Sequence, residues 1–142
     1  MPMPPEYFHA SRDFEAFMEA LKRISLLQTT HQCYTMVEAV FHALRNRMSP
    51  REAIAFAGRL PPVLRAIFVS DWDVEAPRLP MIDRAGLQRE ILAFRHNHNL
   101  STPSALEDVG AALRETMGMA EFGRLIEAMP PELAHLWRSD FP

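Results

Sequence analysis

The sequence predicts an all-α protein of about eight helices, arranged as two pseudo-symmetric four-helix halves that pack as one bundle-like domain. Two observations lead to this prediction: an internal repeat covers most of the chain, and apolar residues recur at helical spacing throughout. A third observation agrees with them, because no stretch alternates β-branched and polar residues as a half-buried strand does. We expect one shared core, since neither half can bury its apolar stripes alone.

The repeat aligns Thr35–Trp72 with Ser104–Phe141 without a gap. The residues that recur are mainly helix caps, prolines, core positions and a few polar positions. In the first copy they are Glu38, Val40, Ala43, Leu44, Arg45, Met48, Glu52, Pro61, Pro62, Leu64, Ser70 and Asp71.

Two repeat positions differ in opposite senses. Phe41 corresponds to Gly110, whereas Ala53 corresponds to Phe122. A large residue exchanged for a small one in each direction can conserve core volume, and it can also leave the halves with unequal pockets.

We expect residues 1–10 to form an extended N-terminal arm and residues 11–142 to form a single all-α domain. The arm holds three prolines, which fix φ and remove backbone donors. Its aromatic residues, Tyr7 and Phe8, are expected to dock on the body or on a second copy.

The first half, residues 11–72, contains four predicted helices. Ser11 is expected to cap the first helix, which runs to about Leu26, and a short connection through residue 31 precedes the second. The capping-box sequence Ser49-Pro50-Arg51-Glu52 begins the third, and Pro61-Pro62 separates it from the fourth. The helical stripes are Phe14, Phe17, Met18, Leu21 and Ile24; Val37, Val40, Phe41, Leu44 and Met48; Ile54, Ala57 and Leu60; and Leu64, Ile67 and Phe68.

Residues 73–83 contain two prolines and no periodicity, which predicts a linker. The second half, residues 84–142, repeats the pattern. Thr102-Pro103 is expected to cap its long helix, and Pro130-Pro131 to begin its last one. The stripes are Leu87, Ile91 and Phe94; Leu106, Val109, Leu113 and Met117; Phe122, Leu125, Ile126 and Met129; and Leu133, Leu136 and Trp137.

Composition excludes several classes of function. The net charge of −3 and the absence of any Lys/Arg run argue against nucleic-acid binding. The single cysteine allows no internal disulfide, the N-terminus lacks the features of a signal peptide, and no apolar run is long enough to span a membrane. We therefore expect a cytoplasmic protein that does not contact membranes.

Particular motifs resemble a known family. The succession ALRNRM, SPREA and RLPPVLRAIFVSDW, with ALRETM and MPPELAHLW in the second copy, closely resembles the bacterial domain-of-unknown-function family 2267. The resemblance covers about Phe14 to Phe141, and one departure is Met129 in place of leucine before Pro130. It implies a small all-α cytoplasmic bacterial protein with two related halves. It supplies no established activity and no catalytic residues.

The repeated arginines and aspartates suggest structural polar pairs. We expect Arg45 to pair with Asp71, and Arg114 with Asp140, as a salt bridge in each half. The alternative is an anion site in which both arginines meet. Glu52 and Glu121 each lie third in a short helix, where a glutamate can reach back to the cap.

Histidines and the cysteine offer a metal-site alternative. His31 and Cys33 lie in the predicted connection of the first half, and His96 and His98 lie in the corresponding connection of the second. If the two loops meet, the four side chains could hold a metal ion, although their spacing matches no zinc signature. The competing interpretation is that these are solvated loop residues.

No catalytic residues are predicted. The sequence has no nucleophile motif and, with five glycines, no phosphate-binding loop, so we expect no enzyme activity and no cofactor. Surplus apolar residues favour a non-enzymatic protein-interaction module that acts as a homodimer, with a further protein partner left open. These residues are Tyr7, Phe8, Trp72, Met81, Trp137 and Phe141. The alternatives are a small-ligand or lipid-binding protein with a pocket between the halves, and the metal-binding protein described above.

Overall fold

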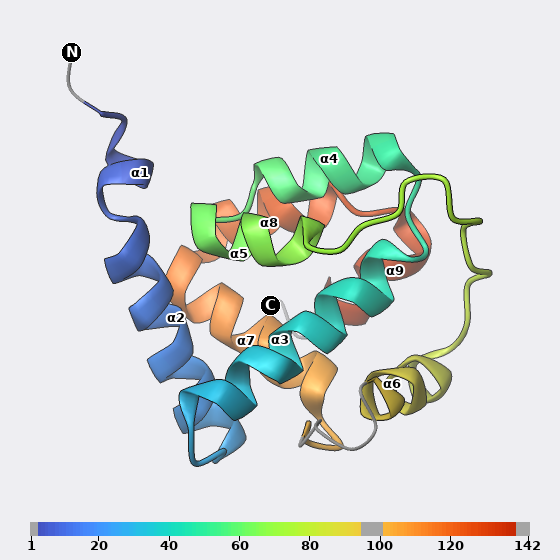
Figure 1. Ribbon diagram of the computed structural model, residues 1–142, viewed down its shortest axis with the longest axis horizontal. Coiled ribbons are helices and arrows are strands. Elements are labelled where there is room, and N and C mark those ends of the chain that lie inside the picture. The colour runs from blue at the N-terminus through green and yellow to red at the C-terminus, as the bar shows by residue number, and fades with distance from the viewer. Residues whose placement is uncertain (1–2, 95–100, 139–142) are drawn as a thin grey trace.

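The structure, a computed structural model, describes residues 3–94 and 101–138, and the described chain is all-helical (Figure 1). The predicted fold class is confirmed. Within those ranges lie nine helices, one of them a single turn of four residues. They are α1 (Pro5–Phe8), α2 (Ala10–Ser25), α3 (Thr30–Arg45), α4 (Pro50–Gly58), α5 (Pro62–Val69), α6 (Arg84–Ala93), α7 (Ala105–Met117), α8 (Met119–Glu127) and α9 (Pro131–Arg138).

The repeat in the sequence appears as three matched helix pairs: α3 with α7, α4 with α8, and α5 with α9. The prolines set the last pair in register, because α5 begins at Pro62 and α9 at Pro131. A pseudo-symmetric relation between the halves in space stays a prediction.

The core is organised around α3. Every residue of this helix from Thr35 to Arg45 is buried. It contacts α2, α5, α6 and α7, while α2 lies along α7 (Figure 1). The buried apolar residues form one cluster that draws on both halves.

The N-terminal segment differs from the expected extended arm. Pro5 begins α1, where its missing N–H costs no helical hydrogen bond and its φ is already helical. The next helix starts at Ala10, so Ser11 lies inside α2 and is not its cap.

The start of α3 also differs from the prediction. Thr29 and Gln32 form a capping box. The backbone N–H of Gln32 donates a hydrogen bond to the Thr29 hydroxyl, and the backbone N–H of Thr29 donates one to Oε1 of the Gln32 side chain. The helix therefore begins at Thr30. His31 and Cys33 lie in its first turn, not in a loop.

The matched short helices α4 and α8 begin differently. Ser49 and Glu52 form the predicted capping box, with the Ser49 amide donating to Glu52 Oε1 at 2.8 Å. In the second copy Gly118 (φ 86°) replaces the serine and supplies no side-chain cap. The expected cap by Glu121 is not made; its carboxylate pairs with Arg124 instead.

Ile54 was expected to be buried in α4 but is 65% exposed. The buried side of this short helix is formed by Ala53, Phe56 and Ala57, because the Phe56 ring packs against Phe68 with centroids 4.8 Å apart. Ala57 and Leu60, the other two residues of the predicted stripe, are buried as expected, so the prediction is wrong only at Ile54.

The start of α7 differs as well. The helix begins at Ala105, and the hydroxyls of Thr102 and Ser104 donate to the buried carboxylate of Asp108 at 2.7 and 3.1 Å. Thr102 therefore supports a side chain of the helix and does not cap its backbone. The amide of Leu106 is capped from outside, by Gln88 Oε1 at 2.9 Å.

Residues 73–83 form the predicted non-helical connection, and the end of α3 holds it in place. The Leu79 amide donates to the Asn46 carbonyl at 2.9 Å, and Arg47 Nε donates to the Pro80 carbonyl at 3.0 Å. The Arg47 guanidinium also donates two hydrogen bonds of 2.8 Å to the Glu90 carboxylate of α6. This single buried arginine joins α3, the linker and α6.

Candidate functional site

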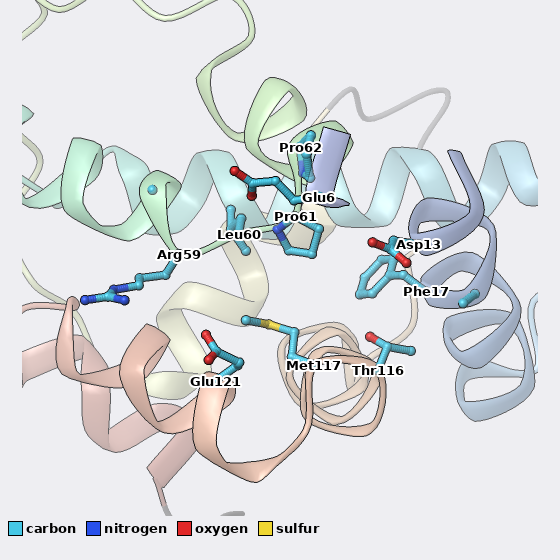
Figure 2. Close-up of a pocket in the computed structure, with 12 residues that line it drawn as sticks. Glu6, Asp13, Phe17, Arg59, Leu60, Pro61, Pro62, Thr116, Met117 and Glu121 are labelled. Carbon is cyan, nitrogen blue, oxygen red and sulfur yellow. The ribbon is translucent and has the colours of Figure 1, made fainter. Parts of the chain in front are cut away.

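A pocket of about 330 Å³ opens between the two copies of the repeat (Figure 2). We call it the inter-repeat pocket. The first copy supplies the step between α4 and α5, and the second supplies the junction of α7 and α8. The lining residues are Glu6, Asp13, Ala16, Phe17, Gly58, Arg59, Leu60, Pro61, Pro62, Thr116, Met117 and Glu121.

The floor of the inter-repeat pocket is apolar. Phe17 and Leu60 are buried, and Met117 is half-buried against the core. Figure 2 shows Phe17 and Met117 between the carboxylates of Glu6 and Asp13 on one side and Glu121 on the other. An apolar floor below polar groups is typical of small-molecule sites.

The charge around this pocket is negative. Glu6 pairs with Arg65 at 3.2 Å and Glu121 pairs with Arg124, whereas Asp13 has no basic partner within the described ranges. The carboxyl-terminal ends of α4 and α7 and the amino-terminal ends of α5 and α8 all lie at the pocket, so the helix dipoles largely cancel and the side chains set its charge. Arg59 belongs to the lining, but Figure 2 shows its side chain directed away from the other lining groups. A positively charged ligand suits this field best.

Arg45, the first of the repeated arginines, is buried and bonded to main-chain carbonyls. Its Nη1 donates to the Phe68 carbonyl at 2.9 Å and to the Ser70 carbonyl at 2.8 Å. These bonds replace the expected salt bridge to Asp71, an exposed residue with φ 52°. Burial lowers the pKa of Arg45, and the charge of Asp71 partly offsets this effect. Arg45 therefore ties α3 to the end of α5.

The second predicted polar pair cannot be placed in full, because Asp140 lies outside the described residues. Its partner Arg114 lines a small crevice beside Gly110 and Trp137, whereas Arg45 lines different cavities. The structure does not bring the two arginines together, so they do not form the alternative anion site.

Of the four predicted metal ligands, the two that the structure describes lie in different surroundings. His31 is exposed, whereas Cys33 is fully buried, and burial raises the pKa of its thiol. His96 and His98 lie outside the described residues. Among the described residues, no three metal-binding side chains cluster.

A second cavity, of about 450 Å³, lies beside Arg45, and we call it the Arg45 cavity. Trp72 and Arg78 line it with the start of α4, and the Arg45 guanidinium carbon lies 5.6 Å from the centre of the Trp72 ring. The repeat singled out Arg45 in the sequence. Nothing in the sequence indicated that Trp72 and the linker would enclose it, because that depends on how residues 73–83 return to α3.

Comparison with known protein families gives a match. The family model described as "Uncharacterized conserved protein (DUF2267)" matches residues 14–136. A search of the curated proteins finds no match. Within residues 3–94 and 101–138, no helix is long and apolar enough to cross a lipid bilayer.

Proposed function

The chain belongs to this family of uncharacterised conserved proteins, and we propose that it is a non-enzymatic interaction module that associates with a second copy of itself through α1. One observation carries the proposal: α1 buries none of its residues. Met3, Tyr7 and Phe8 are 58%, 47% and 71% exposed.

The position of α1 supports this proposal. Figure 1 shows it beyond the end of α2, apart from the other helices. The ion pair between Glu6 and Arg65 ties it to α5. Helices of about one turn are unstable in water without packing, so an exposed aromatic turn gains most from a covering surface.

The area available matches what a dimer needs. Two copies of Met3, Tyr7 and Phe8, scaled by their exposure, would bury roughly 700 Å², and the surfaces that receive them would bury a comparable area. The total falls within the roughly 1,200–2,000 Å² of stable interfaces. A reciprocal contact of this kind closes as a two-fold dimer.

Sedimentation velocity on purified protein tests the proposal. The wild type should sediment as a dimer at micromolar concentration, and the double variant Tyr7→Glu/Phe8→Glu as a folded monomer. Ile54→Glu is the matched control, because Ile54 is 65% exposed on α4 and lies outside α1. A monomeric wild type would refute the proposal, as would a dimer that the double variant leaves intact.

The inter-repeat pocket favours a second candidate function, the binding of a small amphipathic cation. Its volume lies at the lower end of the range for ligand sites. Its apolar floor and unpaired Asp13 suit an alkylammonium group. Calorimetric titration with hexylamine should give saturable binding that Asp13→Asn weakens, while hexanoate should not bind. Equal binding of both probes, or none of hexylamine, would exclude this function.

A further inference from the structure

The guanidinium of Arg45 is buried with only part of its hydrogen-bonding capacity used. The residue is 6% exposed, and both of its hydrogen bonds leave from Nη1. Nε is buried with no acceptor. Buried donors are nearly always paired, so an unpaired one in a residue that lines a cavity needs an explanation.

The unused donors lie on one edge of the group. In a guanidinium, the Nε–H and Nη2–H bonds run parallel, and this edge fits the two oxygens of a carboxylate or phosphate. The Phe68 and Ser70 carbonyls hold the opposite side through Nη1. Arg45 is thereby fixed in place with its two-donor edge lacking an acceptor among the described residues.

The Arg45 cavity has room for a ligand beside this group. Its volume is about 450 Å³, and Trp72 contributes an aromatic wall within cation–π distance of the guanidinium. The other charged residues that line it are Arg78, Asp71 and Asp73. Since two cations face two carboxylates, the cavity suits a ligand with a single negative charge better than a dianion.

We propose that the Arg45 cavity binds a carboxylate group, which pairs with the Nε–Nη2 edge of Arg45 while the body that carries it packs on Trp72. The carboxylate can belong to a free small acid or to the C-terminus of a peptide, because both present the same two oxygens. This site is separate from α1 and from the inter-repeat pocket.

Nuclear magnetic resonance on the full chain tests this proposal without a variant. In ¹⁵N-labelled protein titrated with benzoate, the Trp72 indole N–H and the Arg45 Nε–H signals should shift and saturate. The buried Trp137 indole donates to the Leu106 carbonyl at 2.9 Å, so its signal is an internal reference that should stay constant. If the Trp72 and Arg45 signals do not shift, or if all three drift together without saturation, the proposal is overturned.

Four further ligands define the chemistry. N-acetylphenylalanine should bind and its amide should not, because the amide lacks the carboxylate. The tripeptide Ala-Gly-Phe tests the peptide source: binding at least as tight as that of benzoate assigns the site to a chain terminus, and weaker binding assigns it to a small acid. Inorganic phosphate should bind about tenfold more weakly than benzoate, and equal or tighter binding would overturn the choice of a carboxylate.

Variants then assign the donor. Arg45→Lys keeps a cation that can donate to the Phe68 and Ser70 carbonyls but lacks the two-donor edge, so benzoate affinity should fall about tenfold or more. Asp71→Asn should raise it a few fold, since a facing negative charge is removed. Arg114→Lys, at the matching repeat position, is the control and should not change it. Wild-type affinity in a folded Arg45→Lys variant would contradict the assignment.

Discussion

The indole ring of Trp137 fills the space beside Gly110. A Cβ atom built at Gly110 would lie 2.7 Å from both Cδ1 and Nε1 of the indole. In the first copy the corresponding residues are Phe41 and Phe68, whose rings make an edge contact with centroids 5.6 Å apart. The second copy thus pairs the larger ring, Trp137, with glycine, and the first copy pairs the smaller ring, Phe68, with Phe41. Conservation of core volume therefore explains the difference between Phe41 and Gly110.

Gly110→Ala should therefore destabilise the protein, although alanine is the better helix former. The Trp137 ring is buried and anchored to the Leu106 carbonyl, so it cannot yield easily. We expect a loss of about 1–3 kcal/mol in the free energy of unfolding, measured by urea titration. The matched control is Gly58→Ala in α4, where a Cβ meets nothing within 4 Å. The control should gain about 0.5–1 kcal/mol, and two variants changing in the same direction would argue against the steric explanation.

Glu90→Ala should be among the most damaging substitutions of a partly exposed residue. It leaves the Arg47 guanidinium, whose side chain is 3% exposed, without its two carboxylate bonds. We expect the free energy of unfolding to fall by about 2–4 kcal/mol, a value that allows for the partial exposure of Glu90. Glu90→Gln keeps one acceptor and should lower it less. Glu19→Ala breaks the exposed pair with Lys22 and should cost under about 0.5 kcal/mol. A loss for Glu90→Ala no larger than this control would show that the buried pair does not anchor α6.

Asp108→Asn should change how stability depends on pH. Burial raises the pKa of Asp108, while the hydroxyls of Thr102 and Ser104 oppose this effect. The unfolded chain therefore ionises first as the pH rises, and the wild type loses stability from about pH 4 up to the folded pKa. The variant cannot ionise, so its stability relative to the wild type should increase over the same interval. Glu15→Gln, on the exposed face of α2, is the control. If the difference in the free energy of unfolding between Asp108→Asn and the wild type does not change with pH, this account is contradicted.

Cys33 should react with thiol reagents only when the protein opens. Its side chain is fully buried and burial raises its pKa, so little thiolate is present or accessible near neutral pH. Labelling with a chromogenic disulfide reagent should be slow in native buffer and complete in denaturant. Stoichiometric labelling within seconds in native buffer would mean that the start of α3 is open in solution.

The sequence predicted the parts of the fold that local chemistry determines. Proline at a first helical position places the starts of α4, α5 and α9, and Ser49 with Glu52 forms the expected capping box. The start of α3 is also determined by local chemistry, the capping box of Thr29 and Gln32, which the predicted loop there does not take into account. Ile54 was misplaced because a helix of nine residues has only a narrow buried face, whose direction depends on Phe56 and its neighbours.

The candidate sites were less predictable, for a different reason. Charge suggested Asp71 as the partner of Arg45, but the acceptors are carbonyls at the end of α5, and every residue carries a carbonyl. Which carbonyls come within reach depends on how α3 and α5 pack. Similarly, the inter-repeat pocket joins Asp13, Leu60 and Met117, which only the packed fold brings together.

The central proposal, self-association through α1, is tested most directly by isotope-filtered nuclear Overhauser spectroscopy on a mixture of labelled and unlabelled protein. We predict contacts between copies that involve the ring protons of Tyr7 and Phe8, and their loss in the Tyr7→Glu/Phe8→Glu variant. A spectrum in which these two rings make no contact with a second copy would contradict the proposal.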